Sequence, residues 1–445
     1  MHSPDTAALF AAHLHDISRR TATALAACGY EGLLLQAGEP ALRFLDDQYE
    51  PLHLHPPFKA WVPLADAAGS LLYFEPGRRP RLIFHRQEDY WHKSAELPAE
   101  SWLDAFDISI VGSRTAARAA LPTSLARTAY IGQPFPELLA WGPAAINPQH
   151  LLHRLDFDRA RKTAWEVACL REANAIGARG HRAAEAAFRA GGSEFDIHQA
   201  FLAACEQREQ ELPYNAIVAL NEAAATLHYQ QLQRRAPAEL RSLLLDAGAD
   251  CRGYGSDITR TWSFGDPDFG ALIAAMDDLQ RGLCATVHAG VDWRAMHLLA
   301  VERIATLLVE AEILRCTPQQ AVEQGLATHF FPHGLGHLLG LQVHDVGGTQ
   351  AGPEGGEIPR PAGHPALRLT RVLEPGFVVT MEPGIYFIDA LLAPLRQGPQ
   401  GSQVNWQRVA ALQPFGGIRI EDDLVVTTAG CENLTRDAFA ALSRP

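Results

Sequence analysis

The chain has 445 residues, of which 47% are hydrophobic and 20% charged, and its 38 basic and 51 acidic residues give a net charge of −13. That length exceeds one ordinary hydrophobic core and predicts two domains. A surface this acidic repels nucleic acid and anionic lipid, so we expect neither as a partner. No apolar run in the sequence approaches the ~20 residues that a membrane-spanning helix needs.

The N-terminal stretch and the cysteines favour the cytoplasm. Residues 1–20 carry charged side chains before any long apolar run, which is not the pattern of a signal peptide. The seven cysteines are widely and irregularly spaced and include no CxxC pair, so the sequence indicates neither a disulfide framework nor a zinc knot. We therefore expect a cytoplasmic protein with reduced thiols.

The first part of the chain alternates helix and strand signals. A helix is predicted over residues 7–28 and is ended by Gly29. Short apolar runs bounded by Gly, Pro or charged residues predict strands at 32–35, 70–74, 81–85, 108–111 and 129–131. This alternation favours an α/β domain, which we assign to residues 1–155.

The pattern changes after a break predicted at residues 144–158, where Pro148 and several polar residues interrupt it. Apolar side chains at helical spacing predict long helices at 159–190, 269–288 and 293–315. Strands are predicted at 241–247, 255–264, 377–387 and 417–426. Helices grouped apart from hairpin-like strands indicate an α+β domain with an antiparallel sheet, assigned to residues 156–445.

Two aspartates lie in or beside strands that can pair as a hairpin. If Asp246 lies opposite Asp257, the turn is centred near Cys251–Arg252. Directly opposed residues point to the same face, with Cβ atoms about 5 Å apart. Two half-buried carboxylates that close need a cation or a shared proton between them. The alternative is a pair of turn-capping aspartates, which is the commoner role for this residue type.

A glycine-rich segment carries His333 and His337, and His344 follows in a stretch with strand-like alternation at residues 341–345. The first two histidines have the spacing of an HExxH zinc helix. Glycine follows the first histidine, however, and the glutamate is absent, so we reject that motif. We expect a turn that brings a histidine close to a ligand. Three structural histidines are the alternative.

Two glutamates complete the set of candidates. Strand alternation places Glu382 on the face of Thr380, just before Pro383–Gly384 ends or bends the strand. It places Glu421 on the same face as Arg419. A lone glutamate on a strand usually faces solvent. Four carboxylates and an imidazole on rigid elements nevertheless match a dinuclear site with bridging carboxylates, and such an oxygen-rich set favours Mn²⁺ and similar ions.

The order Asp246, Asp257, His337, Glu382, Glu421 resembles the ligand set of the pita-bread metallopeptidases, a family that includes methionine aminopeptidase, aminopeptidase P and prolidase. The strings that carry the resemblance are LLLDAGA, SDITRTW, HGLGHLLGLQVHDVG, MEPGIYF and FGGIRIED. The last three, with the insert at 389–414, are more similar to prolidase than to methionine aminopeptidase. FLDDQYEPLHLHPPFKAWVP and DYWH resemble the N-terminal domain of the bacterial Xaa-Pro dipeptidase branch, so the likeness covers nearly the whole chain.

This resemblance implies hydrolysis of Xaa-Pro dipeptides by hydroxide held between two divalent metal ions, with Mn²⁺ expected and Zn²⁺ or Co²⁺ as alternatives. It assigns one ion to Asp246, Asp257 and Glu421. It assigns the other to Asp257, His337, Glu382 and Glu421, so that Asp257 and Glu421 bridge. Two ions that share a water lower its pKa towards ~7. Glu382 is then the expected general base.

The resemblance also implies residues that act on the substrate. His228, His333 and His344 line the pocket, with His344 as a donor to the oxyanion and His333 on the proline side. Arg368 is expected to bind the substrate carboxylate and thereby favour dipeptides, and Arg419 to support the site beside Glu421. Tyr214, together with Asp46 or Asp47 of the partner subunit, would close the pocket in a homodimer.

Three alternative functions remain at this point. Aminopeptidase P uses the same kind of site on longer Xaa-Pro peptides, and organophosphate hydrolysis is an alternative side activity. A non-catalytic peptide-binding module on this fold is the alternative from another class, but such a module is expected to lose metal ligands, and all five positions are kept here. The sequence holds no GxSxG, P-loop or GxGxxG motif, so serine hydrolases, NTPases and NAD enzymes lack support.

Overall fold

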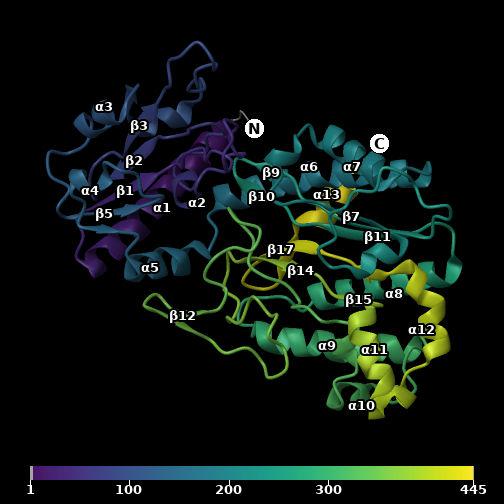
Figure 1. Ribbon diagram of the computed structural model, residues 1–445. Helices are drawn as coiled ribbons and strands as arrows, with labels where there is room; N and C mark the ends of the chain where they lie inside the picture. The colour runs from purple at the N-terminus through teal and green to yellow at the C-terminus, as the bar shows by residue number, and fades with distance from the viewer. Residues whose placement is uncertain (1–3, 444–445) are drawn as a thin grey trace. The chain divides into compact units, whose positions relative to one another are not determined.

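The computed structural model describes residues 4–443, which form two compact units (Figure 1). The first unit comprises the described residues through Arg159, with Thr163–Glu166 and Ala351–Gly356. The second comprises Ala160–Lys162, Val167–Gln350 and the described residues from Glu357 onward. Residues 1–3 and 444–445, which the predicted domain ranges include, lie outside the described residues. The predicted boundary between residues 155 and 156 falls inside α5 (Gln149–Arg159).

A mixed sheet of order β4-β3-β2-β1-β5-β6 forms the centre of the first unit. Its strands are β1 (Gly32–Gln36), β2 (Leu71–Phe74), β3 (Arg81–His85), β4 (Asp107–Val111), β5 (Thr128–Ile131) and β6 (Ala145–Ile146). The strand pairs β1–β2 and β2–β3 are antiparallel, whereas β1–β5, β3–β4 and β5–β6 are parallel. The central strand β1 is buried at every position, which explains its unbroken apolar sequence.

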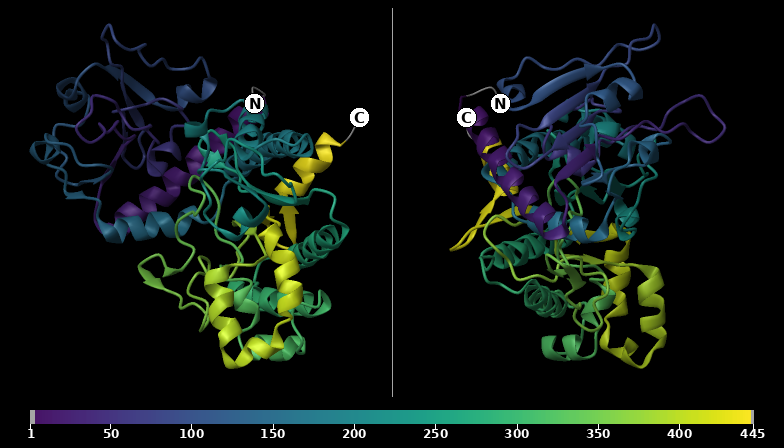
Figure 2. Two further views of the ribbon diagram at one scale, coloured as in Figure 1. Left: turned by 45° about the vertical axis from the view of Figure 1, so that its right-hand side comes forward. Right: turned by 90° about the vertical axis from the view of Figure 1, so that its left-hand side faces the viewer.

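The helices of the first unit are α1 (Pro4–Cys28), α2 (Pro56–Lys59), α3 (Arg114–Ala119), α4 (Leu138–Trp141) and α5, with the 3₁₀ turn η1 (Ser101–Ala105). α1 and α5 lie side by side in both sets of views (Figures 1 and 2). The predicted break at 144–158 is therefore wrong, because most of it is helix α5. Pro148 precedes the first turn of α5, where proline is tolerated, and its oxygen accepts from the N–H groups of Leu151 (3.0 Å) and Leu152 (3.1 Å).

The helix predicted from residue 159 begins later, as α6 (Ala164–Arg189). The preceding residues are extended, since Arg161 forms a β-bridge with Phe377 and the Lys162 N–H donates to Gly376 O at 2.7 Å. Thr163 then caps the helix. Its hydroxyl accepts from the Glu166 N–H at 3.4 Å, and the Glu166 carboxylate accepts from the Thr163 N–H at 2.7 Å. This capping box sets the start of α6.

Antiparallel sheets form the frame of the second unit, as predicted. Their orders are β11-β8-β7, β14-β17-β18, β15-β16 and β10-β9. The strands are β7 (Ile217–Leu220), β8 (Ser242–Asp246), β9 (Asp250–Cys251), β10 (Tyr254–Gly255), β11 (Thr259–Ser263), β14 (Val378–Met381), β15 (Gly384–Tyr386), β16 (Gly417–Arg419), β17 (Asp422–Val426) and β18 (Cys431–Asn433). A further pair, β12 (Gln350–Gly352) and β13 (Gly355–Glu357), forms its own two-stranded sheet, most of which belongs to the first unit.

The helices of this unit after α6 are α7 (Glu194–Cys205), α8 (Pro267–Cys284), α9 (Trp293–Glu310), α10 (Pro318–Glu323), α11 (Asp389–Gln397), α12 (Trp406–Leu412) and α13 (Leu434–Leu442). Its 3₁₀ turns are η2 (Glu209–Glu211), η3 (Asn221–Ala225), η4 (Ala327–His329), η5 (Pro399–Gln403) and η6 (Gln413–Phe415). α8 packs against β11, β14 and α9. Among residues 4–443, no helix is long and apolar enough to cross a bilayer.

The hairpin that carries Asp246 has a different register from the predicted one. Asp246 pairs with Thr259 rather than with Asp257. The turn is centred on Arg252–Gly253, which have φ values of 56° and 94°. Because the register shifts by two residues, the faces of the strands are unchanged and Asp257 takes a diagonal position beside Asp246.

Other predicted strands are shorter or absent. The runs at 377–387 and 417–426 each divide into two strands, β14 with β15 and β16 with β17, which leaves Glu382 and Glu421 at the breaks. The strand predicted at 341–345 does not form. Instead the Asp345 N–H donates to Leu338 O at 2.9 Å, which closes a tight loop around His344.

Candidate metal centre and substrate pocket

Carboxylate and imidazole groups from four separate segments converge in the second unit. Ligand atoms of Asp257, His337 and Glu421 all lie within 4.8 Å of one another, and all three residues are buried. His337 Nε2 lies 3.3 Å from Asp257 Oδ2 and 3.6 Å from Glu382 Oε1. The breaks in the strands therefore aim these side chains at a common point.

Asp246 joins this group through two shared partners. The Tyr214 hydroxyl lies 2.7 Å from Asp246 Oδ1 and 2.7 Å from Asp257 Oδ1. Arg419 Nη2 donates to Asp246 Oδ2 at 2.6 Å. The structure thus brings all five predicted ligands together, with Tyr214 and Arg419 beside them. The Tyr214 hydroxyl has one proton and can donate it to only one of the two aspartates at a time, so it cannot satisfy both carboxylates.

The position and tautomer of His337 follow from its neighbours. A Cβ atom on Gly336 would lie 2.1 Å from Thr380 O, so only glycine allows this segment to approach β14 so closely. The His337 N–H donates to Thr380 Oγ1 at 3.1 Å. His337 Nδ1 lies 3.0 Å from Leu338 O, and the carbonyl requires a proton on Nδ1. Nε2 is consequently left as a ligand atom that faces the carboxylates.

Thr259 holds Glu421, and sequence reasoning missed it. Its hydroxyl donates to Glu421 Oε2 at 2.6 Å and accepts from Arg419 Nε at 3.1 Å. The Glu421 N–H also donates to Thr259 O at 3.0 Å. Thr259 lies two residues after Asp257 in an extended segment. That spacing, which puts two side chains on one face of a strand, is the signal that could have found it.

Burial and mutual repulsion shift the acidic groups of the site. Burial, with the charges of Asp257, Glu382 and Asp246, raises the pKa of Glu421 well above its usual range. Burial likewise raises the pKa of Asp246 and takes that of Glu382 to about 7. For Asp257, burial acts upward, but the bonds from His337 and Tyr214 and the charge of His337 hold its pKa below the usual value.

The same charges act on His337. Burial alone would lower its pKa, but the hydrogen bond and charge of Asp257 and the charge of Glu382 raise it to about 9. Cations are therefore strongly favoured at Nε2. Four carboxylates next to Arg419 leave an excess of negative charge that two divalent ions would balance. An oxygen-rich set with one imidazole suits hard or borderline divalent ions, so the residues fit a dinuclear metal centre.

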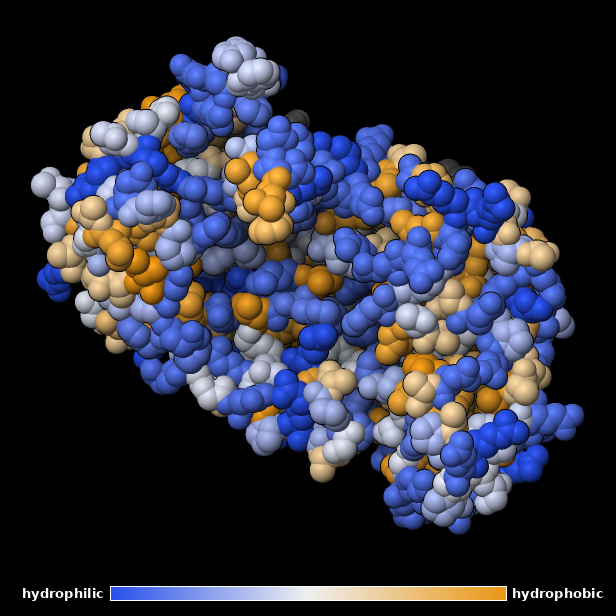
Figure 3. Space-filling model, in the orientation of Figure 1, coloured by the Kyte–Doolittle hydropathy of each residue, from blue (hydrophilic) through white to orange (hydrophobic). Residues whose placement is uncertain are grey.

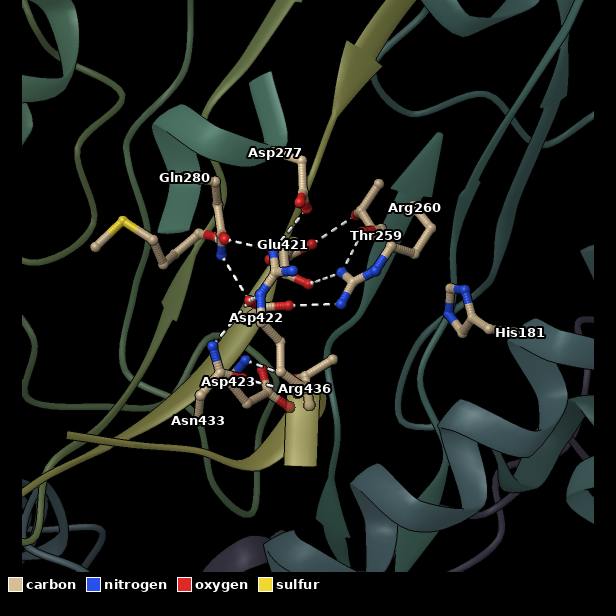
Figure 4. Close-up of polar contacts among 12 residues, drawn as sticks. His181, Thr259, Arg260, Asp277, Gln280, Glu421, Asp422, Asp423, Asn433 and Arg436 are labelled. Atoms are coloured by element: carbon tan, nitrogen blue, oxygen red, sulfur yellow. Dashed lines mark hydrogen bonds and ion pairs between the residues drawn. The ribbon is translucent and has the colours of Figure 1, made fainter. Parts of the chain in front are cut away.

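A second layer of polar residues supports Glu421 from behind (Figure 4). Asp422 is fully buried, and its carboxylate accepts hydrogen bonds from Arg260 Nη2 (2.7 Å), Gln280 Nε2 (2.9 Å), Asn433 Nδ2 (2.9 Å) and Arg436 Nε (2.6 Å). Arg260 Nη1 also donates to Glu421 O at 2.7 Å. The main chain of a metal ligand is thereby tied to a buried ion pair.

Asp423 supports a different ligand, Asp257. Its Oδ2 accepts from the Asp257 N–H at 3.0 Å and from Asn174 Nδ2 at 2.8 Å. Thr435 links the same residues, since its hydroxyl accepts from the Asp423 N–H and donates to Asn174 Oδ1. Three consecutive acids therefore have different roles. Glu421 points into the site, Asp422 binds the residues behind Glu421, and Asp423 binds the backbone of Asp257. No pattern in the sequence separates these roles.

A cavity of about 450 Å³ opens onto the five donors. His228, His344 and Arg368 line it, together with His333 and Arg419. Within the described part of the chain, the polar groups of His228, His344 and Arg368 make no hydrogen bond or ion pair. These three side chains are therefore available to a ligand in the cavity.

Two of the pocket histidines are held neutral. Burial, followed by the charge of Arg419, lowers the pKa of His333 to about 3, and its Nε2 lies 2.8 Å from the Tyr386 hydroxyl. Burial and the charge of His337 lower the pKa of His344 to about 4. The neutral His344 imidazole can donate to a bound ligand from one nitrogen and accept at the other, whereas both nitrogens of His333 are already bonded, Nδ1 to Gly334 O at 2.8 Å and Nε2 to Tyr386.

The loop that carries His344 is fixed by a buried ion pair. Lys162 Nζ lies 2.8 Å from Asp345 Oδ2, and both side chains are 0% exposed. Gly340 is needed beside the pair, because a Cβ there would lie 2.4 Å from Asp345 Oδ2. Asp46 and Asp47 lie in the first unit, on an exposed loop closed by the Leu42–Tyr49 bridge. Their predicted role in a second subunit stays a prediction.

Two protein-family models match the chain. Residues 168–428 match the model described as metallopeptidase family M24. The chain belongs to this family. Residues 8–157 match the model of the Xaa-Pro dipeptidase N-terminal domain. These two matches confirm the predicted family and the fold class of both parts.

M24 relatives cover the full length of the chain. Proteins named Xaa-Pro dipeptidase from Stenotrophomonas maltophilia (strain K279a) and from Xanthomonas euvesicatoria pv. vesicatoria (strain 85-10) are each 48% identical to it. The first match covers 99% of both chains, and the second covers 99% of this chain and 100% of the relative. The structure of proline aminopeptidase P II from Yersinia pestis shares the fold, with a TM-score of 0.70 and 24% identity over 97% of this chain and 100% of that chain.

Proposed function

We propose that this M24 chain hydrolyses Xaa-Pro dipeptides with the help of two divalent metal ions. The observation that carries the proposal is one cavity of about 450 Å³ that is lined both by the five metal donors, three of them buried, and by Arg368, whose guanidinium has no partner among residues 4–443. A cavity that combines a metal centre with an arginine able to bind a carboxylate suits a short peptide with a free C-terminus. The relatives named Xaa-Pro dipeptidase support the same substrate class.

The bound ions would lower the pKa of a shared water towards ~7. The residues of the chain supply the rest of the chemistry. Glu382 lines the cavity beside the other metal donors, so its carboxylate is suited to accept a proton from the attacking water and return it to the prolyl nitrogen. The neutral imidazole of His344 can donate to the developing oxyanion, and His333 can contact the proline side. A prolyl amide has no N–H, and none of these contacts needs one.

Mn²⁺ is the ion that we propose, with Zn²⁺ and Co²⁺ as alternatives. Support comes from the donor set, which offers four carboxylates and one imidazole and no thiolate. Metal analysis of the purified protein, followed by stripping and reconstitution with each ion, tests this choice. Highest activity with Mn²⁺ is the expected result.

A series of peptide lengths separates a dipeptidase from an aminopeptidase of the P type. We expect kcat/KM for Ala-Pro or Leu-Pro to exceed that for the matching Xaa-Pro-Yaa tripeptides by about tenfold or more, because the tripeptide carboxylate lies beyond the reach of Arg368. Ala-Ala serves as the control without proline. Equal or faster cleavage of the tripeptides would assign the longer substrates instead.

We also propose a homodimer in which Asp46 or Asp47 of the partner subunit closes the pocket. Support comes from the loop that carries these residues, where Phe44 and Leu45 are both 92% exposed. Hydrophobic and hydrophilic residues are interspersed over the face shown in Figure 3. Side chains so exposed on a short loop suit a partner that covers them.

The dimer is tested by light scattering after gel filtration. A mass near twice the 48.5 kDa of the chain is expected, and Phe44→Ser together with Leu45→Ser should reduce it to that of one chain. A wild-type monomer would contradict the proposal. The cytoplasm is the compartment that we propose, because all seven cysteines are free thiols.

A further inference from the structure

Glu194 is a buried carboxylate outside the metal centre. It is the first residue of α7, and it is only 2% exposed. The N-terminus of α7 does not need this side chain, because Ser193 and Asp196 already form the capping box. The helix dipole still favours a negative charge at this position. The carboxylate is therefore stabilised by the helix and free to bind another segment.

That segment is the loop of residues 226–233. Glu194 Oε2 accepts from the Tyr229 hydroxyl at 2.9 Å and from the Gln233 N–H at 2.7 Å. Glu194 Oε1 accepts from the N–H of Leu220, at the end of β7, at 3.1 Å. The main chain adds a further bond, from the Phe195 N–H to Gln233 O at 3.1 Å. Glu194 thus joins a strand of the sheet to the loop.

The loop carries His228 next to the anchored tyrosine. Tyr229 and Leu227 pack against the buried cluster that includes Ile217 and Tyr386. His228 lines the cavity, as Leu227 does, and lies within electrostatic range of His333 and His344. Its imidazole makes no hydrogen bond to any residue between 4 and 443. Its place in the pocket is therefore set by the loop rather than by contacts of its own.

We propose that Glu194 is a positioning residue, which anchors the 226–233 loop through Tyr229 and so holds His228 against the substrate. The inference rests on the proposed Xaa-Pro dipeptidase function and extends it to a residue outside the pocket. A carboxylate is required because both oxygens act only as acceptors. Glutamine has nearly the same shape but would turn an NH₂ group towards the N–H of Leu220 or Gln233.

The primary variants are Glu194→Gln and Tyr229→Phe. We expect kcat/KM for a Xaa-Pro dipeptide to fall about tenfold or more in Glu194→Gln, because small displacements of a positioned group have large effects on rate. Tyr229→Phe should lose a smaller factor. The amount of bound metal should stay at the wild-type level in both, since neither side chain touches a metal donor.

Asp196→Asn is the matched control. It replaces the carboxylate that accepts the Ser193 N–H with a weaker amide acceptor, and so weakens the capping box at the same end of α7 without removing a contact with the loop. Its melting temperature should fall while its kcat/KM stays within about twofold of wild type. A kcat/KM loss in Asp196→Asn equal to that in Glu194→Gln would overturn the proposal, because it would assign the effect to the helix end.

A double-variant cycle with His228→Ala distinguishes positioning of His228 from a general effect on the structure. If Glu194 acts through His228, adding Glu194→Gln to His228→Ala should change kcat/KM by less than about twofold. Losses that multiply would overturn the proposal, as would wild-type kinetics in Glu194→Gln. If Glu194→Gln does not fold, the cycle is repeated with Tyr229→Phe and His228→Ala. Losses in kcat/KM that multiply would again overturn the proposal.

Hydrogen exchange separates this inference from the function on which it rests. Faster exchange confined to residues 226–233 in Glu194→Gln is expected, whatever the substrate. A wild-type protein that binds metal but cleaves no Xaa-Pro dipeptide would defeat the proposed function, yet leave the anchored loop standing. Unchanged exchange in this loop would overturn the anchoring itself.

Discussion

The Thr259 hydroxyl donates a hydrogen bond of 2.6 Å to Oε2 of Glu421, and the main chains of the two residues are joined by a bond of 3.0 Å. This pair fixes both the carboxylate and the backbone of Glu421, one of the candidate metal donors. Partners of this kind orient metal ligands, and their loss weakens metal binding or activity by about 10- to 100-fold.

Thr259→Val should therefore lower metal affinity or kcat/KM by about 10- to 100-fold. The isosteric change leaves Glu421 Oε2 without its donor and Arg419 Nε without its acceptor. Metal affinity can be measured by competition with a chromophoric chelator. Thr306→Val on α9 is the control, because its hydroxyl bonds only to Glu302 O on an exposed face. Wild-type metal affinity and activity in Thr259→Val would rule out this role.

Arg368→Ala should raise KM for dipeptides by about tenfold or more, because a charge-assisted bond to the substrate carboxylate is lost. kcat should change less, since the side chain lies away from the reacting bond in the proposed arrangement. Tripeptide KM should hardly move. Arg396→Ala, which removes an exposed arginine from α11, is the control. An unchanged dipeptide KM would show that Arg368 does not bind the carboxylate.

Metal binding should strengthen as the pH rises. In the metal-free protein the pKa of Glu382 is raised to about 7 by burial, and that of His337 is raised to about 9 because Asp257 and Glu382 outweigh the effect of burial. Below these values protons occupy the ligand atoms, and a metal ion must displace them. Affinity should increase by about tenfold per pH unit for each proton released.

Calorimetric titration at about pH 6 and about pH 8, in buffers of different ionisation enthalpy, measures both affinity and proton release. Tighter binding at the higher pH, with protons released, is expected. The same affinity at both pH values, without proton release, would show that neither Glu382 nor His337 is a ligand.

The Lys162–Asp345 pair should behave as a buried ion pair. Lys162→Met or Asp345→Leu alone removes one partner of a buried ion pair and should reduce the free energy of unfolding by about 3–5 kcal/mol. The double variant should recover much of that loss, since neither charge remains. Both single variants should also lower kcat, because Asp345 directly follows His344 and the ion pair fixes the loop that carries both residues.

Urea unfolding of the four proteins measures the stability. Lys93→Met provides the contrast, because Lys93 and Glu96 are 3.8 Å apart and strongly exposed, and such pairs contribute about 0–1 kcal/mol. Single and double variants of Lys162 and Asp345 that all match wild type would contradict the burial of the pair.

Local patterns indicated the five candidate metal donors, which the structure brings together, and the antiparallel frame around them. Each donor lies beside its own apolar run, so strand alternation and nearby glycines indicate where it points. The hairpin register was misjudged by two residues because the turn uses Arg252 at positive φ, which its residue type does not signal. Helix α5 was missed because Pro148 precedes the helix that it was taken to interrupt.

The supporting residues could not be predicted because their contacts are distant in the sequence. Asp345 pairs with Lys162, which is 183 positions away, and that pair bends a segment with strand-like alternation into a loop. Asp423 reaches Asp257 across 166 positions. Glu194 has the sequence context of an ordinary first-turn acid, and only the fold shows that it binds Tyr229. Such roles depend on tertiary packing rather than on local pattern.

Removal and return of metal is the most direct test of the central claim that the buried carboxylates and His337 act through divalent ions. The protein should be stripped with a chelator, assayed on Ala-Pro and Leu-Pro, and assayed again after Mn²⁺ is added, with bound metal measured at each stage. We predict that cleavage is lost on stripping and returns as about two ions per chain bind. Full cleavage by the metal-free protein would contradict the account.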